Sequence, residues 1–185
     1  FGVKNSVIET RLGILSFFQK AAYIINGQRF SLTDIEHGVL RGNRGFPYFP
    51  SPHFSSQDPR SSAVIYPVEP RIHFALNCAS NSCPPIGVYT SRGLKGQLEL
   101  AARNFIQGDL VIDKDQKQIS ISNIFRWYQV DFGGKQGIID FLLNHIIDLG
   151  NQQWLEENRI SVDLNFHPYD WGLNQLIQEN YRQDA

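Results

Sequence analysis

The stretch AAYIINGQRFSLTDIEHGVLR, residues 21–41, decides the fold class because it places a hairpin signal directly before a helix signal. Asn26-Gly27 separates two short apolar runs, and this dipeptide favours a two-residue turn because both of its residues tolerate positive φ. Ser31 can accept hydrogen bonds from the first amides of a helix, and Asp34 follows at the position where an acidic side chain completes a cap. The stretch therefore predicts a β-hairpin followed by a helix over residues 32–41.

The rest of the chain continues to intersperse strands and helices. Residues 71–78 have period-two apolar spacing, which predicts a strand with one buried face formed by Ile72, Phe74, Leu76 and Cys78. Ser91 is expected to cap a helix that runs to Phe105, and residues 110–122 are expected to form a second hairpin, after which Ser122 opens a short helix. Residues 138–149 predict an apolar helix that Gly150 ends, and residues 160–174 suggest a last strand with an aromatic-rich loop. We therefore predict an α+β fold, in which several helices pack on a small, mainly antiparallel sheet.

Residues 42–59, GNRGFPYFPSPHFSSQDP, show neither helical nor strand periodicity. Loops of this length in a compact domain act as lids or binding surfaces, or are disordered. The segment is rich in large aromatic side chains, which favour packing against the body of the protein: Phe46, Tyr48, Phe49 and Phe54.

Composition excludes several classes of function. The chain has 185 residues and 42% hydrophobic residues, which is enough for one domain with its own core, and we treat residues 1–185 as a single domain. A net charge of −1 offers no basic surface for nucleic acid. No apolar run approaches the roughly 20 residues that span a bilayer. The histidines and cysteines lack the spacing of a metal site, and the glycines form no phosphate-binding pattern, so we expect no cofactor. Two cysteines are too few to indicate the cellular compartment.

Glu36 conflicts with the helix that contains it. At 100° per residue, the apolar side chains of residues 32–40 define a stripe that includes Glu36, while His37 lies at its edge. An ionised carboxylate in an apolar interior costs several kcal/mol unless it is paired or protonated. We expect Glu36 to meet a partner, with Arg60 and Arg71 as candidates for a buried ion pair and a catalytic site as the alternative.

The two cysteines, Cys78 and Cys83, lie in RIHFALNCASNSCPPIGVY, residues 71–89. Cys78 shares a face of the predicted strand with apolar residues, which favours an inert thiol in the core. Its position at the end of that strand allows the alternative, a nucleophile at a site into which the strand end opens. As a nucleophile it needs a base, for which His37 and His73 are the candidates. The two thiols can also form a disulfide or a redox pair, although their spacing is a weaker signal than C-x-x-C.

Several stretches together resemble one family, domain-of-unknown-function family 547. The motifs that carry the resemblance are SLTDIEHGVLRGN, DPR at 58–60, RIHFALNCASNSCPPIGVYT, QLELAARNFI, SNIFRWYQVDFG and YDWGLN. The family's aromatic N-terminal segment, of the type FWINLYN, is absent, so we expect the chain to begin inside the family domain. The family is similar in part to thiol hydrolases of the papain and transglutaminase type. That similarity implies a papain-like fold, with Cys78 as nucleophile and His37 as base, and ranks Cys78 above Cys83.

The leading hypothesis is a cysteine hydrolase or acyl-transfer domain that acts on a peptide-like amide. In it Cys78 attacks the carbonyl, His37 takes its proton and Glu36 positions the site. Backbone amides near Ala79 and Ser80 hold the oxyanion. Three further residues line the polar side of the site: Arg71, His73 and Asn77. The alternatives are a protein-interaction module with a buried Glu–Arg pair and a thiol–disulfide redox domain. The expected partner is accordingly a peptide-like substrate or another protein.

Overall fold

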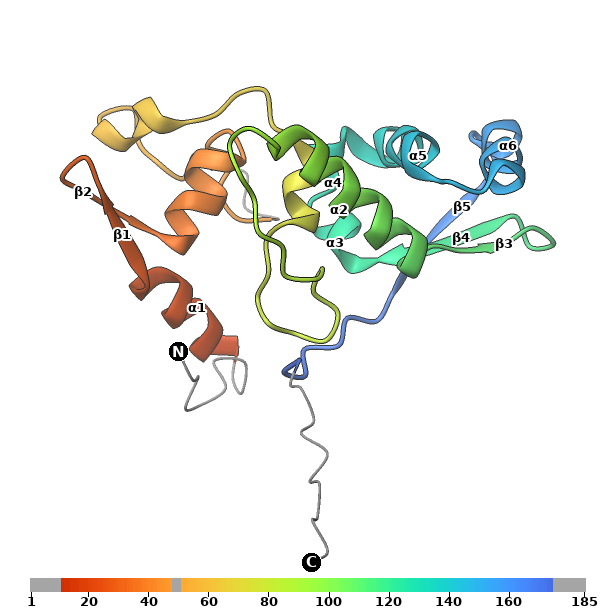
Figure 1. The fold of residues 1–185 in the computed structure, drawn as a ribbon, viewed down its shortest axis with the longest axis horizontal. Coiled ribbons are helices and arrows are strands. Elements are labelled where there is room, and N and C mark those ends of the chain that lie inside the picture. Colours follow the sequence, from red (N-terminus) through yellow and green to blue (C-terminus); the bar gives the residue numbers. More distant parts are fainter. Residues whose placement is uncertain (1–10, 48–50, 175–185) are drawn as a thin grey trace, which may run out of the picture.

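The computed structural model describes residues 11–47 and 51–174 of the chain. It is an α+β protein, with a two-stranded hairpin at one end, helices in the middle and a three-stranded sheet at the other end (Figure 1). None of the helices in the described part of the chain combines the length and the apolar character that a bilayer crossing requires.

The N-terminal end confirms the prediction from residues 21–41. Helix α1 (Arg11–Lys20) leads into an antiparallel hairpin of β1 (Ala22–Ile25) and β2 (Gln28–Ser31), with Asn26 and Gly27 both at positive φ in the turn. Ser31 and Asp34 cap the following helix reciprocally. The Asp34 amide donates to Ser31 Oγ at 3.0 Å, and the Ser31 amide donates to Asp34 Oδ2 at 2.8 Å. The helix itself, η1 (Asp34–Leu40), is a π-helix. This form is rare in proteins, and where it occurs it often lies at a functional site.

The loop after η1 packs onto the body, as its aromatic residues predict. Phe54 is 1% exposed and lies against Gly38, where an added Cβ would come within 2.2 Å of the Phe54 ring. Phe46 contacts the imidazole of His37, with ring centroids 4.5 Å apart. Tyr48 and Phe49 lie outside the described residues. A short 3₁₀ helix, η2 (Pro59–Ala63), ends this loop.

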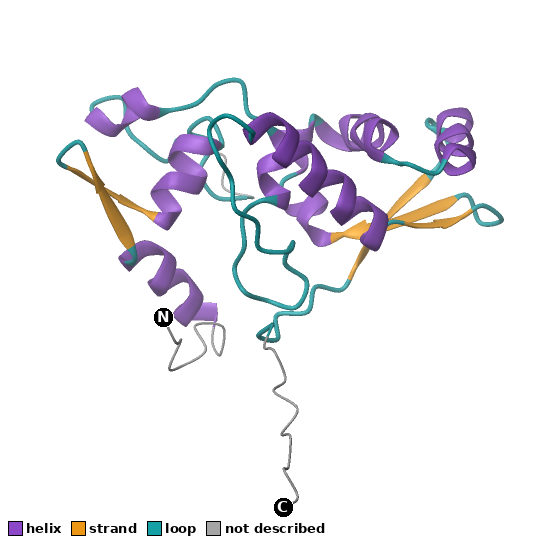
Figure 2. Ribbon diagram, in the orientation of Figure 1, coloured by secondary structure: helices purple, strands orange, loops and turns teal. Residues whose placement is uncertain are grey.

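The middle of the molecule contains the largest helices. Helix α2 (Leu94–Asp109) packs against η3 (Pro70–Phe74) and α5 (Gly134–His145), and the short α3 (Asn123–Trp127) and α4 (Gln129–Phe132) complete this group (Figure 2). Their buried faces form one apolar core with Phe74, Phe125 and Phe141 in mutual aromatic contact. Ser122 caps α3 as predicted, since its side chain accepts from the Ile124 amide.

The sheet has the order β3-β4-β5. Strands β3 (Val111–Asp113) and β4 (Gln118–Ser122) form the predicted hairpin, and β5 (Asp163–His167) joins β4 in parallel. Two of the three strand pairings of the described residues are therefore antiparallel. Helix α6 (Leu149–Asn158) connects α5 to β5.

Three local predictions are wrong. Residues 71–78 do not form a strand: the Glu69 side chain accepts from the Arg71 amide, Pro70 occupies the first helical position and a 3₁₀ helix results. Helix α5 ends at His145, and Gly150 lies inside α6, which Asp148 caps by accepting from the Asn151 amide. Helix α2 begins without a side-chain cap, so Ser91 does not serve as one.

Candidate functional site

The loop between η3 and α2 brings the two cysteine sulfurs together. Cys78 Sγ lies 2.7 Å from Cys83 Sγ, both thiols are free, and both residues are half-buried. Ala79 adopts φ +66°, which turns the chain back immediately after Cys78. The site is thus a close pair of thiols, held on a loop between two packed helices.

Asn77 holds this loop closed. Its Oδ1 accepts from the Ala79 amide at 2.6 Å, and its Nδ2 donates to the Pro84 carbonyl at 2.5 Å. One side chain therefore links the two ends of the segment that contains both cysteines. The Ala79 amide, expected as an oxyanion donor, is already engaged by this contact.

Hydrogen-bond donors converge on Cys83. Its Sγ accepts from the Cys78 amide at 3.0 Å and from the Tyr169 hydroxyl at 3.3 Å, and the Cys78 thiol lies against it. Ser80 Oγ is 2.9 Å from Tyr169 Oη and 3.3 Å from each of the two sulfurs, so its single proton can reach Cys83 through Tyr169 or either sulfur directly.

These donors separate the acidities of the two thiols. The hydrogen bond from Cys78, with further donors from Ser80 and Tyr169, lowers the pKa of Cys83 below its ordinary value. The same contact with Cys83, together with burial, raises the pKa of Cys78 above its ordinary value. Burial also raises the pKa of Tyr169, so its hydroxyl keeps the proton that it donates. Of the two thiols, Cys83 is therefore the more acidic and the better candidate for the nucleophilic thiolate.

The C-terminal segment completes the site. Residues 169–174 run alongside the cysteine loop, where Ser80 and Leu173 form a β-bridge and the Asn81 side chain donates to Asp170 (Figure 2). Tyr169 also packs on Trp127 and Trp171, with ring centroids 4.7 and 4.6 Å away. The sequence analysis quoted YDWGLN as a family motif and assigned it no role in the site.

Glu36, His37 and His73 belong to a second cluster, centred on Asp131 of α4. The Asp131 carboxylate is fully buried and binds Arg41, Arg44 and His73, the last two at 2.9 and 3.0 Å. Burial alone would raise the pKa of Asp131, but these donors outweigh it and hold that pKa well below its usual range. Asp131 is the buried acid that the sequence analysis missed.

The expected ion pair of Glu36 with Arg60 or Arg71 does not form. Glu36 accepts a hydrogen bond from the Tyr128 hydroxyl at 2.6 Å, and Tyr128 stacks on His73. Arg60 instead pairs with Asp34 and Asp58, and Arg71 pairs with Glu69 and Glu99. Each arginine thus pairs with a carboxylate two residues earlier in the chain and with a second carboxylate from another element. The Tyr128 hydroxyl supplies the hydrogen bond to Glu36, so Glu36 needs no arginine partner.

His37 is buried and neutral. Its Nδ1 accepts from Arg41 Nη1 at 2.9 Å, which places the imidazole proton on Nε2. Burial, opposed by the nearby Glu36 carboxylate, lowers the pKa of His37 to about 4.

The structure thus divides the predicted site into two groups. Cys78 and Ser80 lie together with Cys83, and Asn77 and Ala79 shape their loop. Within the described residues, no histidine is hydrogen-bonded to either sulfur. Arg71 lies elsewhere, between the carboxylates of Glu69 and Glu99.

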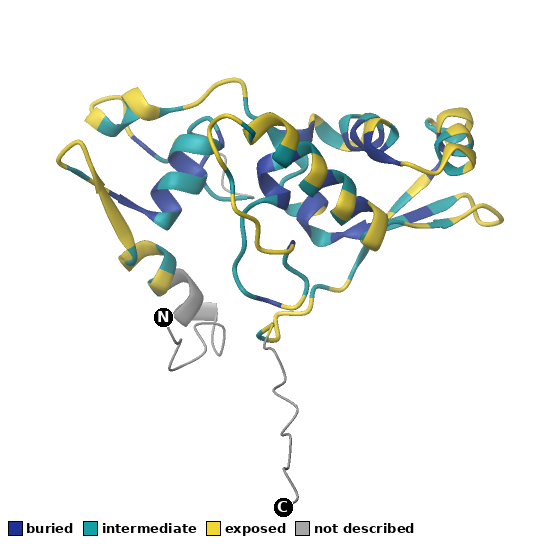
Figure 3. Ribbon diagram, viewed as in Figure 1, coloured by how far each residue is buried: buried dark blue, intermediate teal, exposed yellow. Residues whose placement is uncertain are grey.

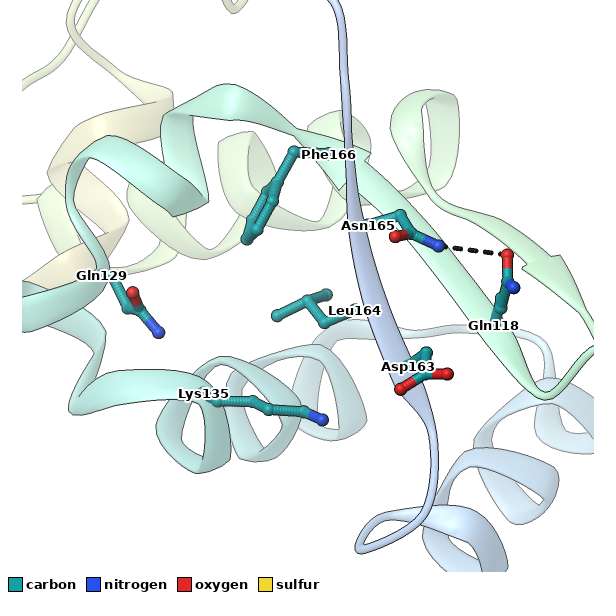
Figure 4. A pocket seen from close by; sticks show the side chains of 7 residues that line it. All are labelled: Gln118, Gln129, Lys135, Asp163, Leu164, Asn165 and Phe166. Atoms are coloured by element: carbon teal, nitrogen blue, oxygen red, sulfur yellow. Dashed lines mark hydrogen bonds between the residues drawn. The ribbon is translucent and has the colours of Figure 1, made fainter.

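Two shallow cavities lie away from both groups. One, of about 350 Å³, is lined by β4, β5 and the adjoining helices, and its residues include Lys135, Asp163 and Asn165 (Figure 4). The other, of about 680 Å³, lies between α5 and α6. Neither of these two cavities is lined by a cysteine.

A comparison with models of known protein families assigns the chain to one of them. Residues 3–106 match the family described as "Protein of unknown function, DUF547", which covers more than half of the chain, including both cysteines. The chain belongs to this family. A search of curated proteins found no match. A search of solved structures found none either. The DUF547 match ends before Asp131 and Tyr169, so the partners of His73 and Cys83 come from beyond the matched region.

Proposed function

We propose that this DUF547 protein is a thiol–disulfide oxidoreductase in which Cys83 is the attacking thiolate and Cys78 the resolving thiol. The observation that carries the proposal is the 2.7 Å contact between the two sulfurs, with further hydrogen-bond donors on Cys83. A disulfide bond is about 2.05 Å long, so the pair needs to close by less than about 1 Å to join.

The reaction follows from the two acidities. The Cys83 thiolate attacks one sulfur of a substrate disulfide, the substrate S–S bond breaks, and the first substrate sulfur leaves as a thiolate. With Cys83 in a mixed disulfide, the anion that raised the Cys78 pKa is gone. Cys78 then loses its proton and attacks Cys83, the mixed disulfide breaks, and the second substrate sulfur leaves and takes that proton. Two electrons pass from the dithiol to the substrate, and the Cys78–Cys83 disulfide remains.

The cysteine hydrolase, with Cys78 as nucleophile and His37 as base, stays a prediction. It needs a proton donor for the leaving amine, and the described structure gives His37 to Arg41 and His73 to Asp131. Exchange with a disulfide needs no such proton donor, because the substrate sulfur leaves as a thiolate. The geometry therefore favours exchange over hydrolysis.

Trapping tests the proposal directly. Cys78→Ser, incubated with hydroxyethyl disulfide, should accumulate a mixed disulfide on Cys83, while the native chain should pass on to an intramolecular disulfide that lacks two protons in its intact mass. Cys83→Ser should react slowly at Cys78, because the thiol that remains has lost its activated partner. Equal trapping in the two serine variants would contradict the assigned roles.

A further inference from the structure

Beside the thiolate lies an exposed apolar strip, residues 85–88. Ile86 is 82% exposed and Val88 is 86% exposed, among the largest exposures of any big aliphatic side chain in the described residues. The strip begins two residues after Cys83 and leads towards α2 (Figure 3). Two neighbouring aliphatic side chains fully in water, next to an activated nucleophile, mark a surface that a substrate covers.

The backbone of the strip is free as well. Residues 84–90 contain no helix, strand or turn, and within the described residues the peptide groups of Ile86 and Gly87 make no hydrogen bond. Pro84 and Pro85 have φ fixed by their own rings, so the start of the strip is conformationally restricted. In an extended backbone Ile86 and Val88 point to the same side. The Val88 carbonyl accepts from Gln97 Nε2 at 3.1 Å, so the strip offers the unpaired peptide groups of Ile86 and Gly87 together with two exposed apolar side chains.

The other border of the thiol pair is aromatic. Tyr169 touches Cys83, and Trp171, which is 42% exposed, packs on Tyr169. The side chains that contact the two sulfurs from elsewhere in the described chain are the uncharged Ser80 and Tyr169. An apolar peptide would therefore find apolar or aromatic side chains on both sides of the Cys83 sulfur, Ile86 and Val88 on one side and Tyr169 and Trp171 on the other.

We infer that the substrate is a polypeptide disulfide whose flanking residues are extended and apolar, and that it docks along residues 85–88 by backbone pairing with Ile86 and Val88 buried against it. This inference rests on the proposed exchange function and names its substrate class. The partner is placed by continuity: a disulfide that reaches Cys83 brings its flanking chain onto the adjoining strip.

The test compares three disulfides. One is a synthetic peptide with an internal disulfide flanked by Val and Leu, the second is the same peptide with Ser and Gly flanks, and the third is hydroxyethyl disulfide. The variant is Ile86→Ser with Val88→Ser. Ile160→Ser is the matched control, because Ile160 is 89% exposed in the turn before β5. A double change to Leu at residues 86 and 88 keeps the apolar surface.

The native chain should prefer the apolar peptide, and the double serine variant should lose at least about tenfold in kcat/KM for that peptide, with an unchanged rate on hydroxyethyl disulfide. The leucine variant and Ile160→Ser should behave like the native chain. An unchanged peptide rate in the serine variant overturns the inference, as does an equal loss on hydroxyethyl disulfide, which would indicate damage to the thiol loop. No exchange with any of the three disulfides by the native chain would instead refute the exchange function, and the inference with it.

Discussion

Tyr169 donates its hydroxyl to Cys83 Sγ at 3.3 Å across 86 positions of sequence. The contact joins the C-terminal segment to the cysteine loop and supplies one of the donors that make Cys83 the acidic thiol of the pair. The low pKa of Cys83 therefore depends in part on a residue outside the part of the chain that matches the family.

Removing this donor should raise the pKa of Cys83. A hydrogen bond to a charged group contributes about 1.5 kcal/mol or more, so Tyr169→Phe should raise that pKa by about one unit. The measurement is the rate of Cys83 alkylation against pH, followed by peptide mass spectrometry. Tyr23→Phe, in the exposed strand β1, is the control and should leave the profile unchanged. Identical profiles for the native chain and Tyr169→Phe would show that this contact does not activate the thiolate.

Asn77 should matter for the geometry of the pair and for stability. Asn77→Ala removes the acceptor of the Ala79 amide and the donor to the Pro84 carbonyl, so the loop should open. We expect a loss of about 1–3 kcal/mol in the free energy of unfolding and a shift of the Cys83 pKa towards its ordinary value. Urea titration and alkylation measure the two effects. Asn165→Ala, which loses an exposed contact with Gln118, should cost little. Should both variants behave alike, Asn77 is not the brace described above.

The buried ion pair of the second cluster should be costly to break. Asp131→Asn leaves the buried Arg41 guanidinium without its carboxylate, and we expect a loss of about 3–5 kcal/mol in the free energy of unfolding. Asp140→Asn breaks a pair with Arg159 that is largely open to solvent and should cost less than about 1 kcal/mol. Chemical denaturation of both variants provides the comparison. Similar losses would mean that the Asp131 cluster does not support the fold.

His37 should make the protein less stable in acid. Its pKa is about 4 in the folded chain against 6.5 ordinarily, so the unfolded chain binds more protons between these values. The free energy of unfolding should therefore fall as the pH falls from about 6.5 to about 4, by at most about 1.4 kcal/mol per pH unit from this group. His37→Gln should show a flatter dependence than the native chain over this window. Parallel curves for the two proteins would contradict a buried, neutral His37.

Local sequence signals predicted much of the fold. The Asn26-Gly27 turn, the Ser31 cap and the Ser122 cap each depend on residues within a few positions, and each is present. The prediction of a strand over residues 71–78 was wrong because the burial of Ile72, His73 and Phe74 depends on distant partners. His73 is buried with a hydrogen bond to Asp131, 58 residues away. The alternation of apolar and polar residues alone could therefore not predict that its side chain is buried. Glu69-Pro70 was the local sign of a helix start that outweighs the period-two pattern.

The site was harder to predict. The sequence analysis considered a Cys78–Cys83 pair and expected Ser80 to serve only through its backbone amide, and the family resemblance ranked Cys78 first. The contacts single out Cys83, because the Cys78 amide and the distant Tyr169 hydroxyl both point to it. Pairings across such separations leave no periodic trace in a single sequence, so neither Tyr169 nor Asp131 could be assigned in advance.

The most direct measurement is the alkylation rate of each cysteine in the native, reduced chain from pH 4 to pH 10, resolved by peptide mass spectrometry, with His37→Ala alongside. The account predicts that Cys83 reacts first and at a lower pH than Cys78, and that His37→Ala leaves this profile unchanged. Preferential reaction of Cys78, with loss of reactivity in His37→Ala, would contradict the account and favour the cysteine hydrolase.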